Sequence, residues 1–158
     1  MNSTPIKHSQ RGMALLVSLV FLLLLTLIGL SSMQSATLQE KMTSSVMLRN
    51  QSFQVAEAAL RIGESAVQVE TYSLPVCTTT IQCAPPPESA TVNAAGRSSS
   101  GVLWVAAAGG FYGVQNIGTT LAAVNVPSNT SATLYRITAV AVVGNNQRSV
   151  VESIYAKY

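Results

Sequence analysis

The sequence predicts an α+β protein in which one long N-terminal helix packs on a small antiparallel β-sheet. Three observations support this fold class. An uncharged apolar run lies near the N-terminus, no proline follows Pro5 until Pro75, and short β-type runs fill the C-terminal part. The 158 residues amount to about one domain. We divide them into a polar leader, an apolar helix half, an amphipathic helix half and a β-rich head, at 1–12, 13–35, 36–70 and 71–158.

The composition excludes two broad classes. Hydrophobic residues make up 48% of the chain and charged residues only 9%, which argues against a disordered protein. The formal net charge is +3, but Lys7 and Arg11 precede the apolar run. Residues 13–158 carry seven basic and six acidic side chains, a net charge of +1. Such a chain has no basic footprint for phosphates, so we expect no direct nucleic-acid partner.

The residues used most often in acid–base catalysis are scarce. The chain has no Asp, and its only His is His8, in the polar leader. Catalytic triads and general acid–base pairs recruit His or Asp beside a nucleophile, and zinc sites need clustered His, Cys or carboxylates. We therefore expect no enzyme, no cofactor and no metal site.

The apolar run is long enough to cross a bilayer. Met13 to Leu30 holds 18 residues without a charge, close to the roughly 20 that span a hydrocarbon core. Lys7 and Arg11 on its N-terminal side predict a cytoplasmic N-terminus and an exported head. Three interpretations remain open: a secretory signal cut near Gly29-Leu30-Ser31, a permanent anchor, or a leader removed before the run, whose helix is then kept.

The helix is expected to continue beyond the apolar run to about Glu70. Apolar positions recur at helical spacing and predict one face in a core, with Arg49 and Gly63 filling gaps in the stripe. Glu57 and Arg61, four residues apart, predict a surface ion pair. The stripe consists of Leu38, Met42, Val46, Phe53, Ala56, Leu60 and Val67.

Two cysteines follow the helix. Cys77 and Cys83 are expected to form a disulfide in an oxidising periplasm and to shape a loop there. Metal binding is the weaker alternative, because two Cys without His or Asp cannot fill a tetrahedral site.

The rest of the head reads as a loop followed by strands. Residues 84–101 are rich in Pro, Ser, Gly and Ala and predict a loop. Gly144-Asn145-Asn146 predicts the turn of the last hairpin, and Trp104 is expected in the core. Tyr135, Ile137, Ala139, Ala141 and Val143 should share one face of their strand. Strands are expected at 102–106, 111–117, 121–126, 133–143 and 148–158.

Two stretches near the N-terminus resemble a known family. Gln10-Arg11-Gly12-Met13-Ala14-Leu15-Leu16-Val17 looks like the cleavage region of a type IV prepilin, with the cut after Gly12. Ala56-Glu57-Ala58-Ala59-Leu60-Arg61 resembles the AEAALR motif of PilX-type minor type IV pilins, and 135–139 is similar to a final-hairpin strand of that family. Residues 71–130 match no family pattern. The resemblance implies a pilin-like fold and a prepilin leader over 1–12. It also implies that a prepilin peptidase cuts after Gly12 and methylates the new N-terminus at Met13.

The resemblance also implies a position in the fibre. Major pilins carry Glu at the fifth residue after the cut, where it neutralises the amino group of a neighbouring subunit; here that residue is Val17. The expected function is therefore a minor pilin of a Gram-negative type IV pilus that primes assembly or sits at the tip. Its expected partners are other minor pilins, the major pilin, a tip adhesin and the inner membrane. The alternatives are a K-type minor pseudopilin of type II secretion and, more distantly, a secreted binding domain with a cleaved signal peptide.

Overall fold

The computed structural model describes residues 10–144 and 146–158, and side chains from Gly12 onward. Most of the expected leader, with Lys7 and His8, and the turn residue Asn145 lie outside the described residues. The chain divides into two compact units, one ending at Ser45 and one from Val46 to Tyr158.

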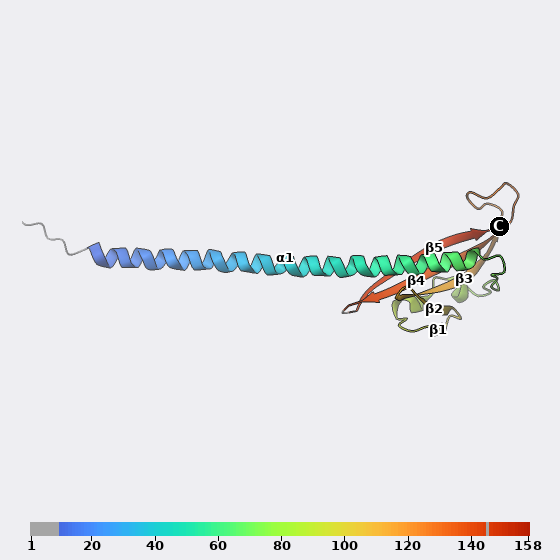
Figure 1. Cartoon of the computed structure of the whole chain (residues 1–158), viewed down its shortest axis with the longest axis horizontal. Coiled ribbons are helices and arrows are strands. Elements are labelled where there is room, and N and C mark those ends of the chain that lie inside the picture. Colours follow the sequence, from blue (N-terminus) through green and yellow to red (C-terminus); the bar gives the residue numbers. More distant parts are fainter. Residues whose placement is uncertain (1–9, 145) are drawn as a thin grey trace, which may run out of the picture. The chain divides into compact units, whose positions relative to one another are not determined.

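The predicted long helix is confirmed. Helix α1 runs over Gln10–Gln68 and ends two residues before the predicted limit (Figure 1). Its hydroxyl groups do not interrupt the apolar part, because Ser18 and Thr26 donate to the carbonyl oxygens of Leu15 and Leu23. These bonds satisfy the hydroxyl donors within the helix, so that the apolar run presents no unpaired O–H group.

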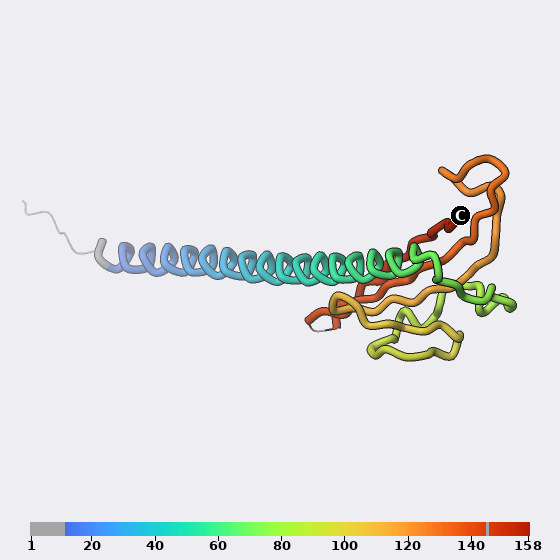
Figure 2. The backbone as a smooth tube through the Cα atoms, turned by 45° about the vertical axis from the view of Figure 1, so that its right-hand side comes forward, coloured from blue at the N-terminus to red at the C-terminus, as the bar shows by residue number. Residues whose placement is uncertain are grey.

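The second unit contains a five-stranded antiparallel sheet in chain order, β1-β2-β3-β4-β5 (Figures 1 and 2). The β4–β5 hairpin is the longest pairing and runs in unbroken register from Thr133↔Lys157 to Val143↔Gln147. The β3–β4 register shifts between Asn116 and Gly118. The strands are β1 Gly96–Arg97, β2 Leu103–Ala107, β3 Gly110–Thr120, β4 Ala132–Val143 and β5 Gln147–Lys157.

Four of the five predicted strands are confirmed with shifted ends, and the one at 121–126 is wrong. Residues 121–131 form the loop between β3 and β4. Asn125 adopts a left-handed φ of 63°, and Pro127 has no backbone donor, so this apolar run does not continue a ladder. The sequence reading also missed β1, because its two residues lie inside the Pro- and Ser-rich stretch. That stretch also holds the 3-10 turn η1 (Pro87–Ala90), and the short helix α2 (Thr80–Cys83) ends just before it.

Strand β4 is buried on both faces. Tyr135, Ile137, Ala139 and Ala141 share the predicted face and are buried, with Val67 of α1 against the first two. Val140 on the opposite face is equally buried, packed with Val102 and Trp104. The loop segment that includes Val92 covers this second face. The expected core position of Trp104 is confirmed.

The face that α1 turns toward the sheet consists of small side chains. Of the predicted stripe, Ala56 and Val67 are buried and Leu60 is half-buried, but Phe53 is 51% exposed. Leu38 and Met42 of the first unit and Val46, the first residue of the second, are also exposed. The residues buried on the helix are Ser52, Ala56, Ala59, Gly63 and Val67.

Candidate functional site

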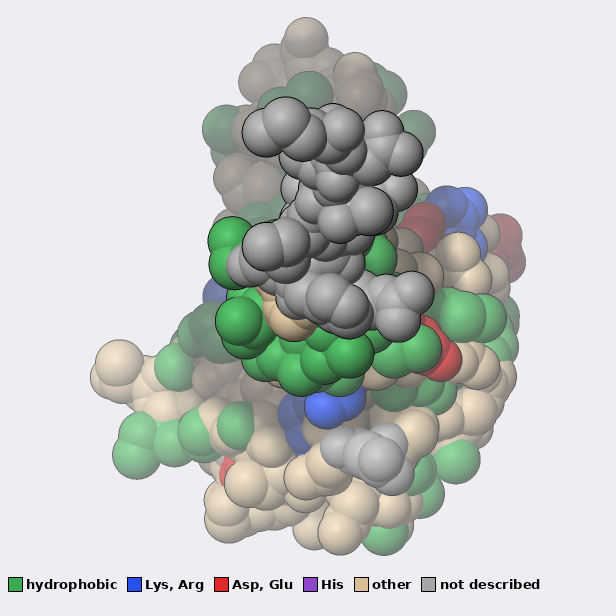
Figure 3. Space-filling model, turned by 90° about the vertical axis from the view of Figure 1, so that its left-hand side faces the viewer, with side chains coloured by type: hydrophobic (Ala, Val, Ile, Leu, Met, Phe, Trp, Pro, Cys, Tyr) green, Lys and Arg blue, Asp and Glu red, His purple; other side chains and the backbone are tan. Residues whose placement is uncertain are grey.

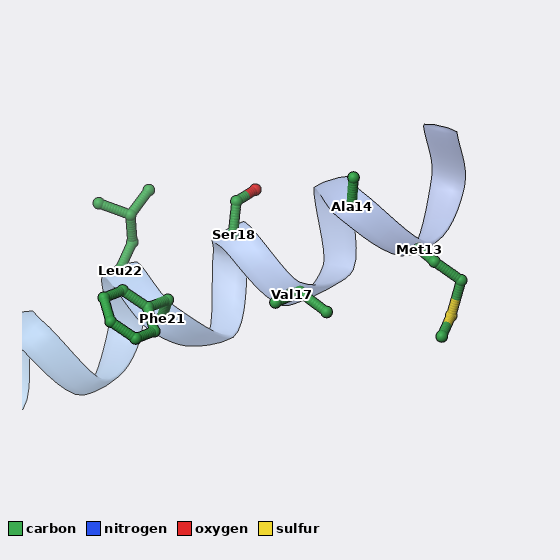
Figure 4. Close-up of a pocket in the computed structure, with 6 residues that line it drawn as sticks. All are labelled: Met13, Ala14, Val17, Ser18, Phe21 and Leu22. Atoms are coloured by element: carbon green, nitrogen blue, oxygen red, sulfur yellow. The ribbon is translucent and has the colours of Figure 1, made fainter. Parts of the chain in front are cut away.

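The expected processing site lies on the first turns of α1. Gly12 and Met13 are helical, and the side chains of Met13 and Val17 are 66% and 62% exposed. A shallow depression runs along this surface (Figure 4), lined by Met13, Ala14, Val17, Ser18, Phe21 and Leu22. Its one hydroxyl group, on Ser18, donates to the carbonyl oxygen of Leu15, 2.9 Å away. The depression is therefore an apolar surface suited to hydrocarbon or to another apolar helix.

The apolar segment carries no charge of its own. The best 18-residue window of α1 has a mean hydropathy of 2.9, and none of it is buried. By length and composition, α1 is the one helix among the described residues that could span a membrane. Hydrophobic side chains dominate the described part of the helix nearest the viewer in Figure 3. An exposed apolar surface of this kind requires a membrane or an apolar partner.

The AEAALR segment packs the helix onto the head. Ala56 and Ala59 are fully buried, and a Cβ placed on Gly110 of β3 would lie 3.5 Å from the Cβ of Ala59. The two alanines thus allow the backbones of helix and sheet to approach closely.

The predicted surface pair in the same segment is confirmed. Arg61 Nη2 donates to Glu57 Oε1 at 2.7 Å, on the exposed side of the helix. This hydrogen bond and the negative charge of Glu57 raise the pKa of Arg61 above its ordinary value.

The expected disulfide between Cys77 and Cys83 is present. Thr79 caps α2 by accepting a hydrogen bond from the Gln82 backbone N–H, and α2 ends at Cys83. The backbone N–H of Cys77 donates to the carbonyl oxygen of Asn116 in β3, at 2.9 Å. The disulfide ring is therefore joined directly to the sheet.

Two further side chains fix this ring, and the sequence reading did not single out either for that role. Arg136 of β4 donates to the Cys83 carbonyl oxygen at 2.6 Å and also pairs with Glu152 of β5 at 3.1 Å. Gln115 of β3 is 6% exposed and donates from Nε2 to the carbonyl oxygens of Gln82 and Ala84. A polar side chain beside the apolar residues of a strand could have suggested a buried hydrogen bond, but not its partner.

Glu88 anchors the loop that covers the second face of the sheet. Its Oε1 accepts hydrogen bonds from Ser99 Oγ and from the Ser100 backbone N–H, both at 2.7 Å. Burial alone would raise the pKa of Glu88, but these donors and nearby backbone hydrogen bonds outweigh it and lower the pKa to about 2. The carboxylate therefore stays charged and bonded at neutral pH.

Tyr72 lies four residues after the end of α1 and packs against the sheet. Its ring meets that of Tyr135 edge-on, with centroids 5.7 Å apart. Burial, together with the neighbouring Tyr112 and Tyr135, raises the pKa of Tyr72 to about 12. The phenol is therefore neutral and serves packing.

Nothing in this arrangement suggests a metal centre. Within the part of the chain that the structure describes, no group of three or more His, Cys, Asp or Glu side chains could hold a metal ion. The features that do stand out are an exposed apolar helix, a packed helix–sheet interface and a disulfide loop.

A helix that is apolar and exposed in its first half and packed on an antiparallel sheet in its second half defines a pilin-like α+β protein. Residues 11–61 match the family described as PilX N-terminal, so this part of the chain is similar to the N-terminal part of PilX-type type IV pilins. The match covers about a third of the chain and includes Gly12, Met13, Val17 and the whole AEAALR segment. PilX pilins are structural components of the pilus. No curated protein and no solved structure matches the chain significantly.

Proposed function

We propose that this chain is a minor pilin that primes type IV pilus assembly and sits at the fibre tip with other minor pilins and an adhesin. Cleavage after Gly12 leaves Met13 as a methylated N-terminus. The helix waits in the inner membrane until it joins the fibre. The head performs no chemistry; the processing peptidase and the assembly machinery supply catalysis and energy.

Val17 is the observation that carries the tip position. It lies four residues after Met13 on an exposed helix surface whose neighbours are all uncharged. A charged amino group inside an apolar helix bundle is costly unless an acid pairs with it. A subunit with valine at this position cannot neutralise the N-terminus of a neighbour, so it is poorly suited to positions inside the fibre and well suited to the top.

The orientation follows from charge and redox compartment. Arg11 flanks the apolar segment, and no further charge occurs before Glu40. Basic residues on the N-terminal side favour a cytoplasmic N-terminus, which places the head in the periplasm. The Cys77–Cys83 disulfide supports an oxidising compartment for the head.

The experiment that tests this proposal is the intact mass and N-terminal sequence of the protein extracted from membranes of its native host. We expect a chain that begins at Met13 and carries one added methyl group. A chain that begins near Ser32 would instead mean a secreted domain, and an uncut chain a permanent anchor.

A second measurement separates the pilus from a secretion pseudopilus. We expect the processed protein in pili sheared from the cell surface, at low copy number relative to the major pilin. Its absence from sheared pili, combined with a secretion defect in a strain that lacks it, would favour the pseudopilin.

A further inference from the structure

The last strand leaves one long edge of the sheet open. All eleven residues of β5 pair with β4, and the sheet order ends at β5, so no described strand lies on its outer side. At its C-terminal end, Lys157 Nζ donates to the carbonyl oxygens of Val69 and Tyr72, which ties this end to the helix terminus. Between Gln147 and Ile154, Ser149 and Ser153 bond to Ser52 and Glu64 of α1, and Arg148 donates to the loop carbonyl oxygens of Ser89 and Val92. These bonds are made by side chains, and among the described residues no further backbone hydrogen bond is made along the outer edge of this part.

This edge has few of the devices that keep sheet edges from pairing. Its three charged side chains, on Arg148, Glu152 and Lys157, are all bonded to other groups within the head. Natural edge strands avoid pairing because they are short, contain a bulge or a proline, or carry charged side chains that point outward. β5 is eleven residues long, contains no proline and keeps an unbroken register with β4. Val150 and Ile154 are 45% and 57% exposed, on the side away from the helix. The opposite edge of the sheet, β1, has only two residues.

A groove lies beside the open edge. It has a volume of about 370 Å³ and lies between one turn of α1 and the start of β5, lined by Arg49, Asn50, Phe53, Arg148, Ser149 and Val150. Within the described residues, Arg49 has no carboxylate within ion-pair distance. One wall of the groove is the edge of β5, with its backbone donors and acceptors. The guanidinium group of Arg49, which no carboxylate neutralises among the described residues, lies at its rim.

A second copy of this chain does not fit the edge. Two β5 strands related by a two-fold axis pair antiparallel, which also reverses the two α1 helices that pack on them. The helix segments packed on the two heads, 46–68 in each copy, would then enter them from opposite sides, whereas neighbouring subunits of the pilus proposed above enter their heads from the same side. The occupant must therefore be a different protein.

We propose that β5 accepts an extended segment of another pilus subunit as a sixth strand, with an acidic side chain of that segment on Arg49. Backbone hydrogen bonds along 148–154 provide the affinity. The exposed Val150 and Ile154 select apolar side chains on one face. This interface rests on the proposed pilus function and specifies how the head engages its neighbour.

A photo-crosslinking amino acid at position 150 of the full chain, expressed in the native host, tests the interface. We expect an adduct with another pilus subunit, mapped by mass spectrometry to an extended segment that contains Asp or Glu. Ile154→Lys should lower the adduct yield several-fold, because an outward lysine protects an edge strand. Leu103→Lys on β2 is the matched control, since Leu103 is 51% exposed and lies away from this edge; it should leave the yield unchanged.

Charge is tested separately. Arg49→Glu should lower the adduct yield, whereas Arg97→Glu, the same charge change on β1, should not. Both arginines are exposed, so neither variant should unfold the head. The proposal is overturned by no adduct, by adducts only with lipid or with a second copy, or by a control variant that lowers the adduct yield as much as the variant it is paired with. A chain found in sheared pili without the adduct would overturn this interface and leave the proposed function standing.

Discussion

Single carboxylates in the head differ sharply in what they do. Glu88 accepts two hydrogen bonds at 2.7 Å from Ser99 and Ser100, while Glu57 pairs with a mostly exposed arginine on the surface. Surface pairs of the second kind contribute about 0.2–1 kcal/mol. Glu88 instead joins the two ends of the loop that covers the second face of the sheet, so its ionisation is linked to folding.

The pH dependence of stability follows from the pKa of Glu88. Its folded pKa of about 2 lies below the ordinary value of 4.5, so the folded state favours the carboxylate. The stabilisation is complete above pH 4.5 and is lost as the pH falls toward 2. We expect Glu88→Gln to flatten the decline of the melting temperature between pH 5 and about pH 2.5.

The measurement is thermal unfolding of the full chain in detergent, followed by Trp104 fluorescence. Trp104 is the only tryptophan and is 2% exposed, so its emission reports the head alone. Glu70→Gln is the matched control, because Glu70 is exposed just after α1 and its carboxylate accepts no hydrogen bond from the described residues. Equal slopes for Glu88→Gln and the unaltered chain would contradict the assignment.

At the scale of elements, the helix–sheet interface explains which predictions succeeded. The long helix could be predicted because its signals are local: no proline, few glycines and helical spacing of apolar residues. The disulfide could be predicted because the chain has only two cysteines and the basic residues before the apolar run predict an exported head. The helix face was predicted less well, because it was assigned by hydrophobicity. The interface selects small residues such as Ser52 and Gly63, and Phe53 is left in solvent.

The strands, too, could be predicted from the sequence only in part. The β4–β5 hairpin alternates clearly, whereas residues 121–126 are apolar without being a strand, since the left-handed Asn125 turns the chain. The disulfide ring could be located from the sequence, but its bonds to Arg136 and Gln115 span more than thirty residues. Contacts at that separation depend on the fold and leave no local pattern.

Gly63 gives the interface a direct test. A Cβ at this position would lie 2.7 Å from Ile137 Cγ2 and 2.9 Å from the Tyr112 ring, both too close. Alanine ordinarily stabilises a helix by about 0.5–1 kcal/mol over glycine. Overpacking a filled core costs about 1–3 kcal/mol, so we expect Gly63→Ala to lower the free energy of unfolding by about 1–2 kcal/mol.

Urea unfolding of the full chain, again followed by Trp104, measures this change. Ser65→Ala on the exposed side of the same helix is the control and should not destabilise the head, because alanine has the higher helix propensity. A Gly63→Ala variant as stable as the unaltered chain would mean that helix and sheet separate readily.

At the scale of the whole molecule, the two units have different surroundings. The first unit is an apolar helix surface without charges between Arg11 and Glu40, which requires lipid or other helices. The second unit has its own core on both faces of β4 and one open strand edge. In the pilus that we propose, such a subunit offers two separate surfaces to neighbours, one on the apolar helix and one at the open edge of the sheet. Val17 belongs to the first of these two surfaces, the apolar helix, and not to the head.

Val17→Glu tests the position in the fibre that we propose. A glutamate there could neutralise the N-terminus of a neighbouring subunit, so the variant could also join the fibre below another subunit. We expect it to insert in the membrane, because its side chain can reach the cytoplasmic side, and to raise the number of copies in sheared pili. Quantitative mass spectrometry of sheared pili, normalised to the major pilin, measures the change.

Val20→Glu is the matched control, because Val20 is 53% exposed in the same apolar segment but lies one helical turn deeper. A charge there costs about 2.5–3.5 kcal/mol toward the bilayer centre and finds no N-terminus to pair with. Its copy number should therefore stay the same or fall. If Val17→Glu leaves the copy number unchanged while the protein still inserts and is cut after Gly12, the missing acid does not set the position of this subunit. The tip assignment would then have to rest on the head and on the partner that it binds.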